Sequence, residues 1–203
     1  MLRTPAPLKG ALGVTFNVME PFVERIYVEE LLTQCTWALS AVERMNEVLQ
    51  SPDGGGPQVF FRQAADLLQH AALASKLLWP PGSSIGFKNK RAKSRGLHLR
   101  TALQMPQQHV LRSRSLRDHF EHYDERLDDW VVRSPNRIIV NNVIGPRTTI
   151  GGNVVQDHEI FKLFDPQTKR LLFRGEPFDL QELVDALVDV TNRAKNRLAL
   201  LAP

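Results

Sequence analysis

The stretch EPFVERIYVEELLTQCTWALSAVERMNEVLQ, residues 20–50, decides the fold class of this chain. Its apolar residues recur every three or four positions, which is the spacing of one face of an α-helix. They are Phe22, Ile26, Val28, Leu31, Leu32, Cys35, Leu39, Val42, Met45 and Leu49. The spacing therefore predicts a long helix with one broad buried face.

Three more helices are predicted along the chain. The run SPDGGGP at residues 51–57 ends the first helix, and a helical pattern resumes over residues 59–78. A third long helix is expected over residues 109–132, because apolar residues form a stripe there between charged ones. The closing helix is expected from Asp179, whose side chain is suited to cap the helix with Glu182 three positions later.

Between the third and closing helices the pattern becomes extended. Residues 137–144 are rich in Ile and Val, residues 159–164 alternate, and residues 165–168 form a turn into residues 169–173. We therefore expect a mainly α protein: a bundle of about four long helices, with a small antiparallel β-hairpin or sheet inserted before the C-terminal helix. The parts of this single domain, residues 1–203, are a lead-in at 1–19 with a short strand at 11–18, a β insertion at 137–175 and a closing helix at 179–200.

Length and composition indicate a globular, soluble protein. The chain has 203 residues, of which 42% are hydrophobic, and one cysteine, Cys35, which falls in an apolar helical pattern and is expected to be buried. No stretch approaches the roughly 20 apolar residues of a membrane span, so we expect a cytoplasmic protein without membrane contact. The formal charge of +4 is too mild to choose between nucleic acid and other ligands.

One segment concentrates positive charge. Residues 87–100 contain no acidic residue and link the second and third predicted helices. Such a block is either a solvated linker or an electrostatic track for a nucleic-acid backbone. The candidate nucleic-acid-binding residues are Lys88, Lys90, Arg91, Lys93, Arg95 and Arg100.

The best candidate for a catalytic site lies in LRDHFEHYDER, residues 116–126. On a helix, Asp118 and His122 are one turn apart and can form a hydrogen bond, whereas Arg117 and His122 point about 140° apart. Arg117 would approach His122 more easily across two copies of the helix packed antiparallel about a two-fold axis. An imidazole, a guanidinium and an orienting carboxylate are the groups needed to cleave RNA without a metal.

This arrangement resembles the HEPN superfamily, helical-bundle proteins whose ribonuclease members carry Arg, a polar residue, a few more residues and then His on a late helix. Arg117, Asp118 and His122 match that motif, and the resemblance spans the helical portion of the chain. It implies a homodimer with the active cleft at the interface, RNA as substrate, and metal-independent endoribonuclease activity of the toxin or defence kind. A partner such as an antitoxin is implied as well.

Other interpretations of these residues stay open at the level of sequence. His119 and His122 can be polar positions on a charged helix face, paired with neighbouring carboxylates. Asp118, His119 and His122 can share a metal ion, but no further ligand pair elsewhere supports one, so neither a metal nor a cofactor is expected. The competing function is a catalytically silent interaction module that binds a protein partner or a nucleotide.

Overall fold

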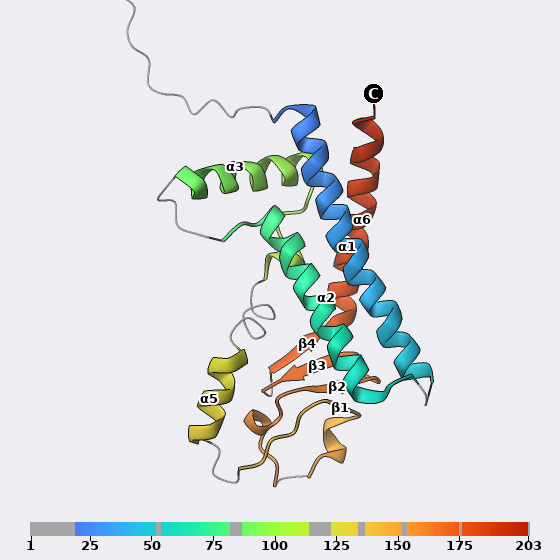
Figure 1. The fold of residues 1–203 in the computed structure, drawn as a ribbon, viewed down its shortest axis with the longest axis vertical. Helices are drawn as coiled ribbons and strands as arrows, with labels where there is room; N and C mark the ends of the chain where they lie inside the picture. The colour runs from blue at the N-terminus through green and yellow to red at the C-terminus, as the bar shows by residue number, and fades with distance from the viewer. Residues whose placement is uncertain are drawn as a thin grey trace, which may run out of the picture.

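The structure, a computed structural model, describes residues 19–51, 54–81, 87–113, 123–133, 137–151, 154–174 and 176–202. This part of the chain is mainly helical, with a small sheet directly before the last helix (Figure 1), which confirms the predicted class. No helix in these ranges is long and apolar enough to cross a membrane. The expected strand at residues 11–18 lies outside the described residues.

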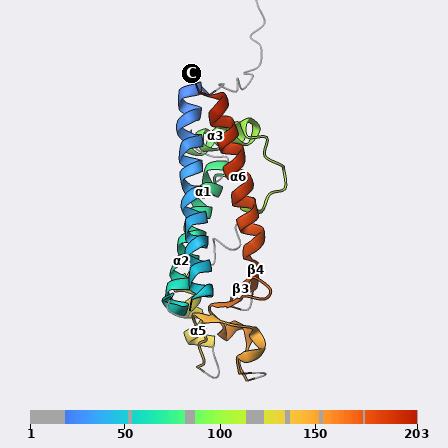
Figure 2. The ribbon, with the colours of Figure 1, turned by 90° about the vertical axis from the view of Figure 1, so that its right-hand side faces the viewer.

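Three long helices make up the body: α1 (Pro21–Gln50), α2 (Gly56–Leu78) and α6 (Leu180–Leu200). α1 packs against both of the others, and Figures 1 and 2 show it running beside α6. Cys35 is fully buried in this core, as expected, and burial raises the pKa of its thiol to about 12. The helix layer thus forms without any covalent cross-link among the described residues.

The buried face of α1 differs from the predicted one. Phe22 and Ile26 are 73% and 49% exposed, although the pattern placed them on the buried face, while Glu24 is 2% exposed. A contact between α1 and two other helices explains the difference, because Glu24 faces basic side chains from α3 and α6. The apolar pattern was therefore correct for the helix but wrong for part of its buried surface.

The basic segment between the second and third predicted helices is itself a helix, α3 (Phe87–Ala102), which was not predicted. It lies across the end of α2 (Figure 1) and is fixed by the buried side chains of Leu99 and Leu103. Gly96 permits the close approach, because a Cβ atom there would lie 2.6 Å from the Leu78 carbonyl oxygen. Few apolar residues mark α3 in the sequence, so its helical period was hidden.

The prediction of a third long helix over residues 109–132 is wrong at its N-terminal end. Residues Val110–Arg112 form a short 3₁₀ turn, η1, which begins with the His109 side chain accepting a hydrogen bond from the Leu111 N–H, and Ser113 is extended. The chain is helical again in α5 (Tyr123–Arg133). Residues 114–122 lie outside the described residues.

The sheet is mixed rather than antiparallel, with strand order β1-β2-β3-β4. β1 pairs in parallel with β2, while β2, β3 and β4 are antiparallel neighbours. The strands are β1 (Val143–Ile144), β2 (Leu163–Asp165), β3 (Arg170–Phe173) and β4 (Glu176–Asp179). β1 is much shorter than the predicted strand at 137–144, and β4 was not predicted.

The β2–β3 hairpin and the start of α6 agree with the sequence. Asp165 accepts hydrogen bonds from the Gln167 N–H and the Thr168 hydroxyl, which closes the predicted turn. Asp179 accepts from the Glu182 N–H at 3.0 Å and caps α6 as expected. The sheet packs on the beginning of α2 through the Phe60 and Phe164 rings, whose centroids are 4.6 Å apart.

Candidate nucleic-acid interface

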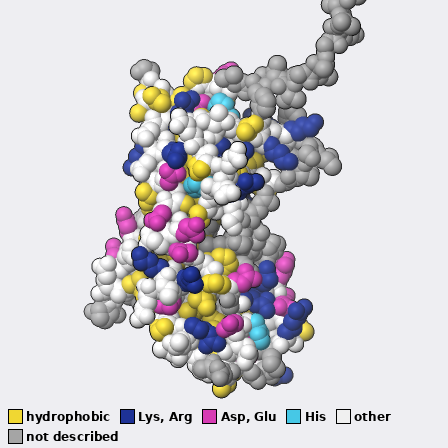
Figure 3. Space-filling view, turned by 180° about the vertical axis from the view of Figure 1, so that it is seen from behind, with side chains coloured by type: hydrophobic (Ala, Val, Ile, Leu, Met, Phe, Trp, Pro, Cys, Tyr) yellow, Lys and Arg dark blue, Asp and Glu magenta, His cyan; other side chains and the backbone are white. Residues whose placement is uncertain are grey.

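The six predicted RNA-contacting residues divide into two groups on α3. Lys90, Arg91 and Lys93 are exposed, and Figure 3 shows Lys and Arg side chains gathered over this part of the molecule, at the upper right. Arg95 and Arg100 are half-buried and turn toward the protein. The side chain of Lys88 lies outside the described residues.

Arg95 and Arg100 attach α3 to the end of α2. Arg95 donates to the Lys76 carbonyl at 3.1 Å, and Arg100 donates to the Leu78 carbonyl. The last carbonyls of a helix have no partner within it, so these arginines satisfy oxygens that would otherwise need water. Part of the predicted RNA-binding block therefore has a structural role.

One face of α3 carries its exposed lysines toward a cleft. At about 100° per residue, Lys90, Lys93, Leu97 and Arg100 fall within a sector of roughly 80°. The first and fourth of these are separated by roughly 15 Å along the helix axis. We call Lys90, Lys93 and Arg100 the basic track.

The cleft lies at the C-terminal end of this track. It has a volume of about 560 Å³ and is formed by the end of α2, the last turns of α3, the following loop and η1. No described residue that lines it is acidic, whereas two are arginines. The lining residues are Trp79, Leu97, Arg100, Thr101, Gln104, Met105, Pro106, Gln107 and Arg112.

The two arginines of the cleft influence each other. Burial, and then the neighbouring positive charge of Arg112, lower the pKa of Arg100 from its usual value. Arg112 is exposed and donates to the Gln107 carbonyl at 3.1 Å. Two like charges thus share one cleft without a carboxylate in its described lining.

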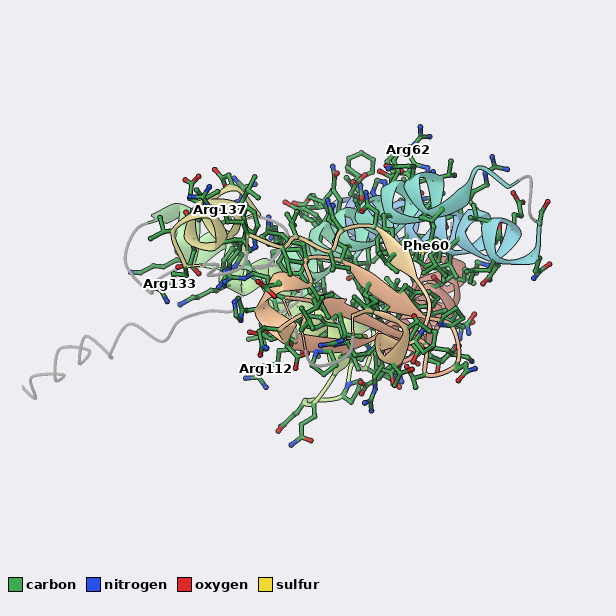
Figure 4. All side chains as sticks on the ribbon, turned by 90° about the horizontal axis from the view of Figure 1, so that it is seen from below. Phe60, Arg62, Arg112, Arg133 and Arg137 are labelled. Atoms are coloured by element: carbon green, nitrogen blue, oxygen red, sulfur yellow. The ribbon has the colours of Figure 1, made fainter. Side chains whose placement is uncertain are left out.

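Arginines outside α3 do not add to this cleft, apart from Arg112. Figure 4 shows Arg62 and Arg112 on opposite sides of the molecule, whereas Arg133 and Arg137 lie near each other at α5. Phe60, labelled in the same view, lies between α2 and the sheet. Lys and Arg side chains also lie over the lower part of the molecule in Figure 3, where Asp and Glu side chains are interspersed among them.

His109 lies beside the cleft but is not available as a general base. Its Nδ1 accepts the Leu111 N–H at 3.2 Å, and its Nε2 lies 3.6 Å from a carboxylate oxygen of Asp189. Its ring stacks on Trp79 with the centroids 5.4 Å apart. Burial lowers the pKa of His109 and favours the neutral ring, whose only lone-pair nitrogen already has a donor.

A second histidine belongs to a buried ionic cluster. Glu24 pairs with Nε2 of His98 at 2.7 Å and with Nε of Arg197 at 2.5 Å, which joins α1, α3 and α6. Burial opposes ionisation of Glu24, but the hydrogen bonds and charges of Arg197 and His98 outweigh it and lower the pKa of the carboxyl group. This cluster fixes the position of α3 on the bundle.

The predicted catalytic residues Arg117, Asp118 and His122, and also His119, lie outside the described residues. α5 begins at Tyr123, immediately after His122. Within the described ranges, no group of three His, Cys, Asp or Glu side chains is placed to hold a metal ion.

Sequence reasoning missed the cleft and the ionic cluster. Arg112 and Trp79 come from different segments, and no local pattern links them to Arg100. Glu24 and Arg197 are separated by 173 positions, so neither residue carries a signal for the other. Only the absence of acidic residues in 87–100 pointed toward this end of the molecule.

The comparisons with known proteins add no relative. No protein-family model matches the chain, and neither the search of curated proteins nor the search of solved structures found a similar protein.

Proposed function

We propose that this protein is a HEPN-like RNA-binding protein that holds the phosphate backbone along α3 and cleaves RNA at a dimer interface. The observation that carries the binding part is the basic track, which leads into a cleft with two arginines and no acidic residue in its described lining. Phosphate contacts supply most of the affinity of sequence-independent nucleic-acid binding. Lys90, Arg91 and Lys93 are exposed and project from a rigid helix, which suits them to this role.

The cleavage part rests on the motif at Arg117, Asp118 and His122. In this proposal His122 removes the proton of the RNA 2′-hydroxyl, and the 2′-oxygen attacks the adjacent phosphorus. The bond from phosphorus to the 5′-oxygen breaks, and that oxygen takes a proton from water, which leaves a cyclic phosphate and a 5′-hydroxyl; His122 returns its proton to the solvent. Arg117 stabilises the charge on the phosphoryl oxygens, and Asp118 orients His122.

Binding and cleavage are tested on the same mixed-sequence single-stranded RNA in EDTA. We expect Lys90→Gln together with Lys93→Gln to weaken binding and to reduce the slope of log affinity against log salt by about 1.4, since each phosphate contact contributes roughly 0.7. Arg62→Gln, an exposed arginine on α2 far from the track, is the matched control and should leave both quantities unchanged. Equal losses in the lysine pair and in Arg62→Gln would contradict binding along α3.

Cleavage has its own variant. We expect wild-type protein to yield fragments with cyclic phosphate and 5′-hydroxyl ends, and His122→Ala to bind the RNA without cutting it. Intact RNA in both samples, with binding preserved, would remove the catalytic part of the proposal and leave the binding part.

The second candidate, an interaction module for a protein partner such as an antitoxin, is favoured by one observation. Phe22, Ile26 and Trp37 are 73%, 49% and 53% exposed, and they fall within about 60° on one face of α1. Exposed apolar residues grouped on one face are typical of protein-binding surfaces. Variants at Trp37 and at Lys90 test the two functions separately.

A further inference from the structure

We infer that the cleft between α3 and η1 is a phosphate-binding site, in which Arg100 and Arg112 hold the oxygens of one phosphate group. This deepens the proposed function, because it places one phosphate of a bound RNA at the end of the basic track. The site would equally accept free phosphate or the phosphate of a nucleotide, since the recognised chemistry is the same.

The donors of the site are already oriented. One N–H of Arg100 is held by the Leu78 carbonyl, and one N–H of Arg112 is held by the Gln107 carbonyl. A guanidinium has five N–H donors, so both side chains keep most of theirs for an anion. Anchoring by one N–H restricts the guanidinium and reduces the ordering cost of binding.

The charge balance of the cleft favours an anion. Arg100 and Arg112 repel each other, and no described lining residue is acidic. Asp189, which faces His109 beside the cleft, is paired with Arg193 at 2.7 Å. A phosphate between the two arginines would replace repulsion with two charge-assisted contacts.

The C-terminal end of α3, which carries partial negative charge, also faces this region. Arg193 donates to the Leu103 and Gln104 carbonyls at 3.3 and 2.7 Å. Leu103 and Gln104 directly follow α3, so Arg193 brings a positive charge to this end of the helix and offsets its partial negative charge. The basic character of the cleft is therefore not cancelled by the helix dipole.

The aromatic residue of the cleft indicates recognition of the phosphate rather than of a base. Trp79 is stacked on His109, and the Arg100 guanidinium lies 5.9 Å from the Trp79 ring centroid. These neighbours occupy the ring, so base stacking is not part of the proposed site. The volume of about 560 Å³ nevertheless leaves room for the rest of a nucleotide.

The test titrates inorganic phosphate, adenosine 5′-monophosphate and a short single-stranded RNA at constant ionic strength. We expect Arg112→Gln to weaken the binding of all three by about tenfold or more, with Arg112→Lys intermediate because lysine cannot form a fork of two hydrogen bonds. Arg62→Gln is the matched control and should bind like wild type. Because Arg112 is exposed, its variants should keep the circular dichroism spectrum and unfolding midpoint of the wild type.

The outcomes separate the site from the proposed function. If Arg112→Gln binds phosphate and RNA as wild type does, the phosphate site is wrong, whereas RNA binding along α3 stands. If the wild type binds phosphate and the nucleotide through Arg112 but does not bind RNA, the site stands and the RNA proposal fails. Absence of phosphate binding by the wild type also overturns the site.

Discussion

At the scale of single residues, Glu24 is the most consequential side chain that the structure describes. It is a carboxylate with 2% exposure, placed between His98 and Arg197. A buried carboxylate of this kind adds little net stability by itself, but removing it leaves Arg197 without a counter-charge and His98 without its hydrogen-bond partner. Its role is to fix three helices in one arrangement.

We expect Glu24→Gln to lower the free energy of unfolding at pH 7 by about 2 kcal/mol, since His98 and Arg197 are partly exposed and recover some solvation. The folded pKa of Glu24 is lowered, so its stabilisation is present above the ordinary carboxyl pKa and is lost as pH falls through the folded value. The difference between wild type and Glu24→Gln should therefore shrink below about pH 4.5. Urea unfolding of both proteins at a series of pH values measures it, and a constant difference down to pH 3 would contradict this assignment.

At the scale of elements, α3 shows how a helix with few apolar residues is held in place. Its contacts with α2 come from two arginines that reach helix-end carbonyls and from Gly96, which lets the backbones approach. The same contacts direct the exposed lysines of the track outward. Arg100 thus takes part in both attachment and the basic track, whereas Lys90 and Lys93 are exposed and left for RNA.

Gly96→Ala is expected to destabilise the protein by about 1–3 kcal/mol, although alanine is the better helix former. The added Cβ would lie 2.6 Å from the Leu78 carbonyl oxygen and from Cδ of Pro80, and α3 would have to move. Ser94→Ala, on an exposed position of the same helix, is the matched control and should change stability by less than about 0.5 kcal/mol. If thermal unfolding showed both variants equally stable, the close approach of α3 to α2 would be wrong.

At the scale of the whole molecule, the proposed active site needs a second copy of the chain. The described part of the third helical region, α5, exposes Val131 and Val132 by 64% and 83%. These residues follow the candidate catalytic motif in the sequence and are available to pair with another copy. α1 offers a separate apolar face at Trp37.

We expect the protein to be a dimer that Val131→Asp together with Val132→Asp converts to a monomer, because charge at an apolar contact opposes its burial. Trp37→Ser is the control on α1 and should leave the dimer intact. Light scattering measures the mass. If Trp37→Ser alone dissociated the dimer, the dimer interface would lie on α1. A monomeric wild-type protein would contradict the proposed active site at a dimer interface.

A composite site also predicts complementation between inactive variants. Equimolar mixing of Arg117→Ala and His122→Ala should restore roughly a quarter of wild-type cleavage, because half of the dimers would each hold one intact site. Unmixed variants are the controls. No recovery after exchange of subunits would show that each chain supplies its own Arg117 and His122.

Local patterns in the sequence were enough for α1, α2, α6, the β2–β3 hairpin and the Asp179 cap. Each of these depends on residues within one or two turns, or on a short turn motif, so their determinants are neighbours along the chain. The sequence by itself also located the basic residues of α3 and the Arg117–His122 motif, on which the proposed function rests.

Tertiary structure decided the rest. Three features depend on segments that are distant in sequence. Glu24 is buried while Phe22 is exposed, the basic segment is a helix docked on α2, and Arg100 and Arg112 share a cleft. The physical reason is that the environment of a charged side chain is set by what packs around it, not by its neighbours along the chain. The sequence thus determined which charges are present, and the packing of α3 against α1, α2 and α6 decided which are structural and which face solvent.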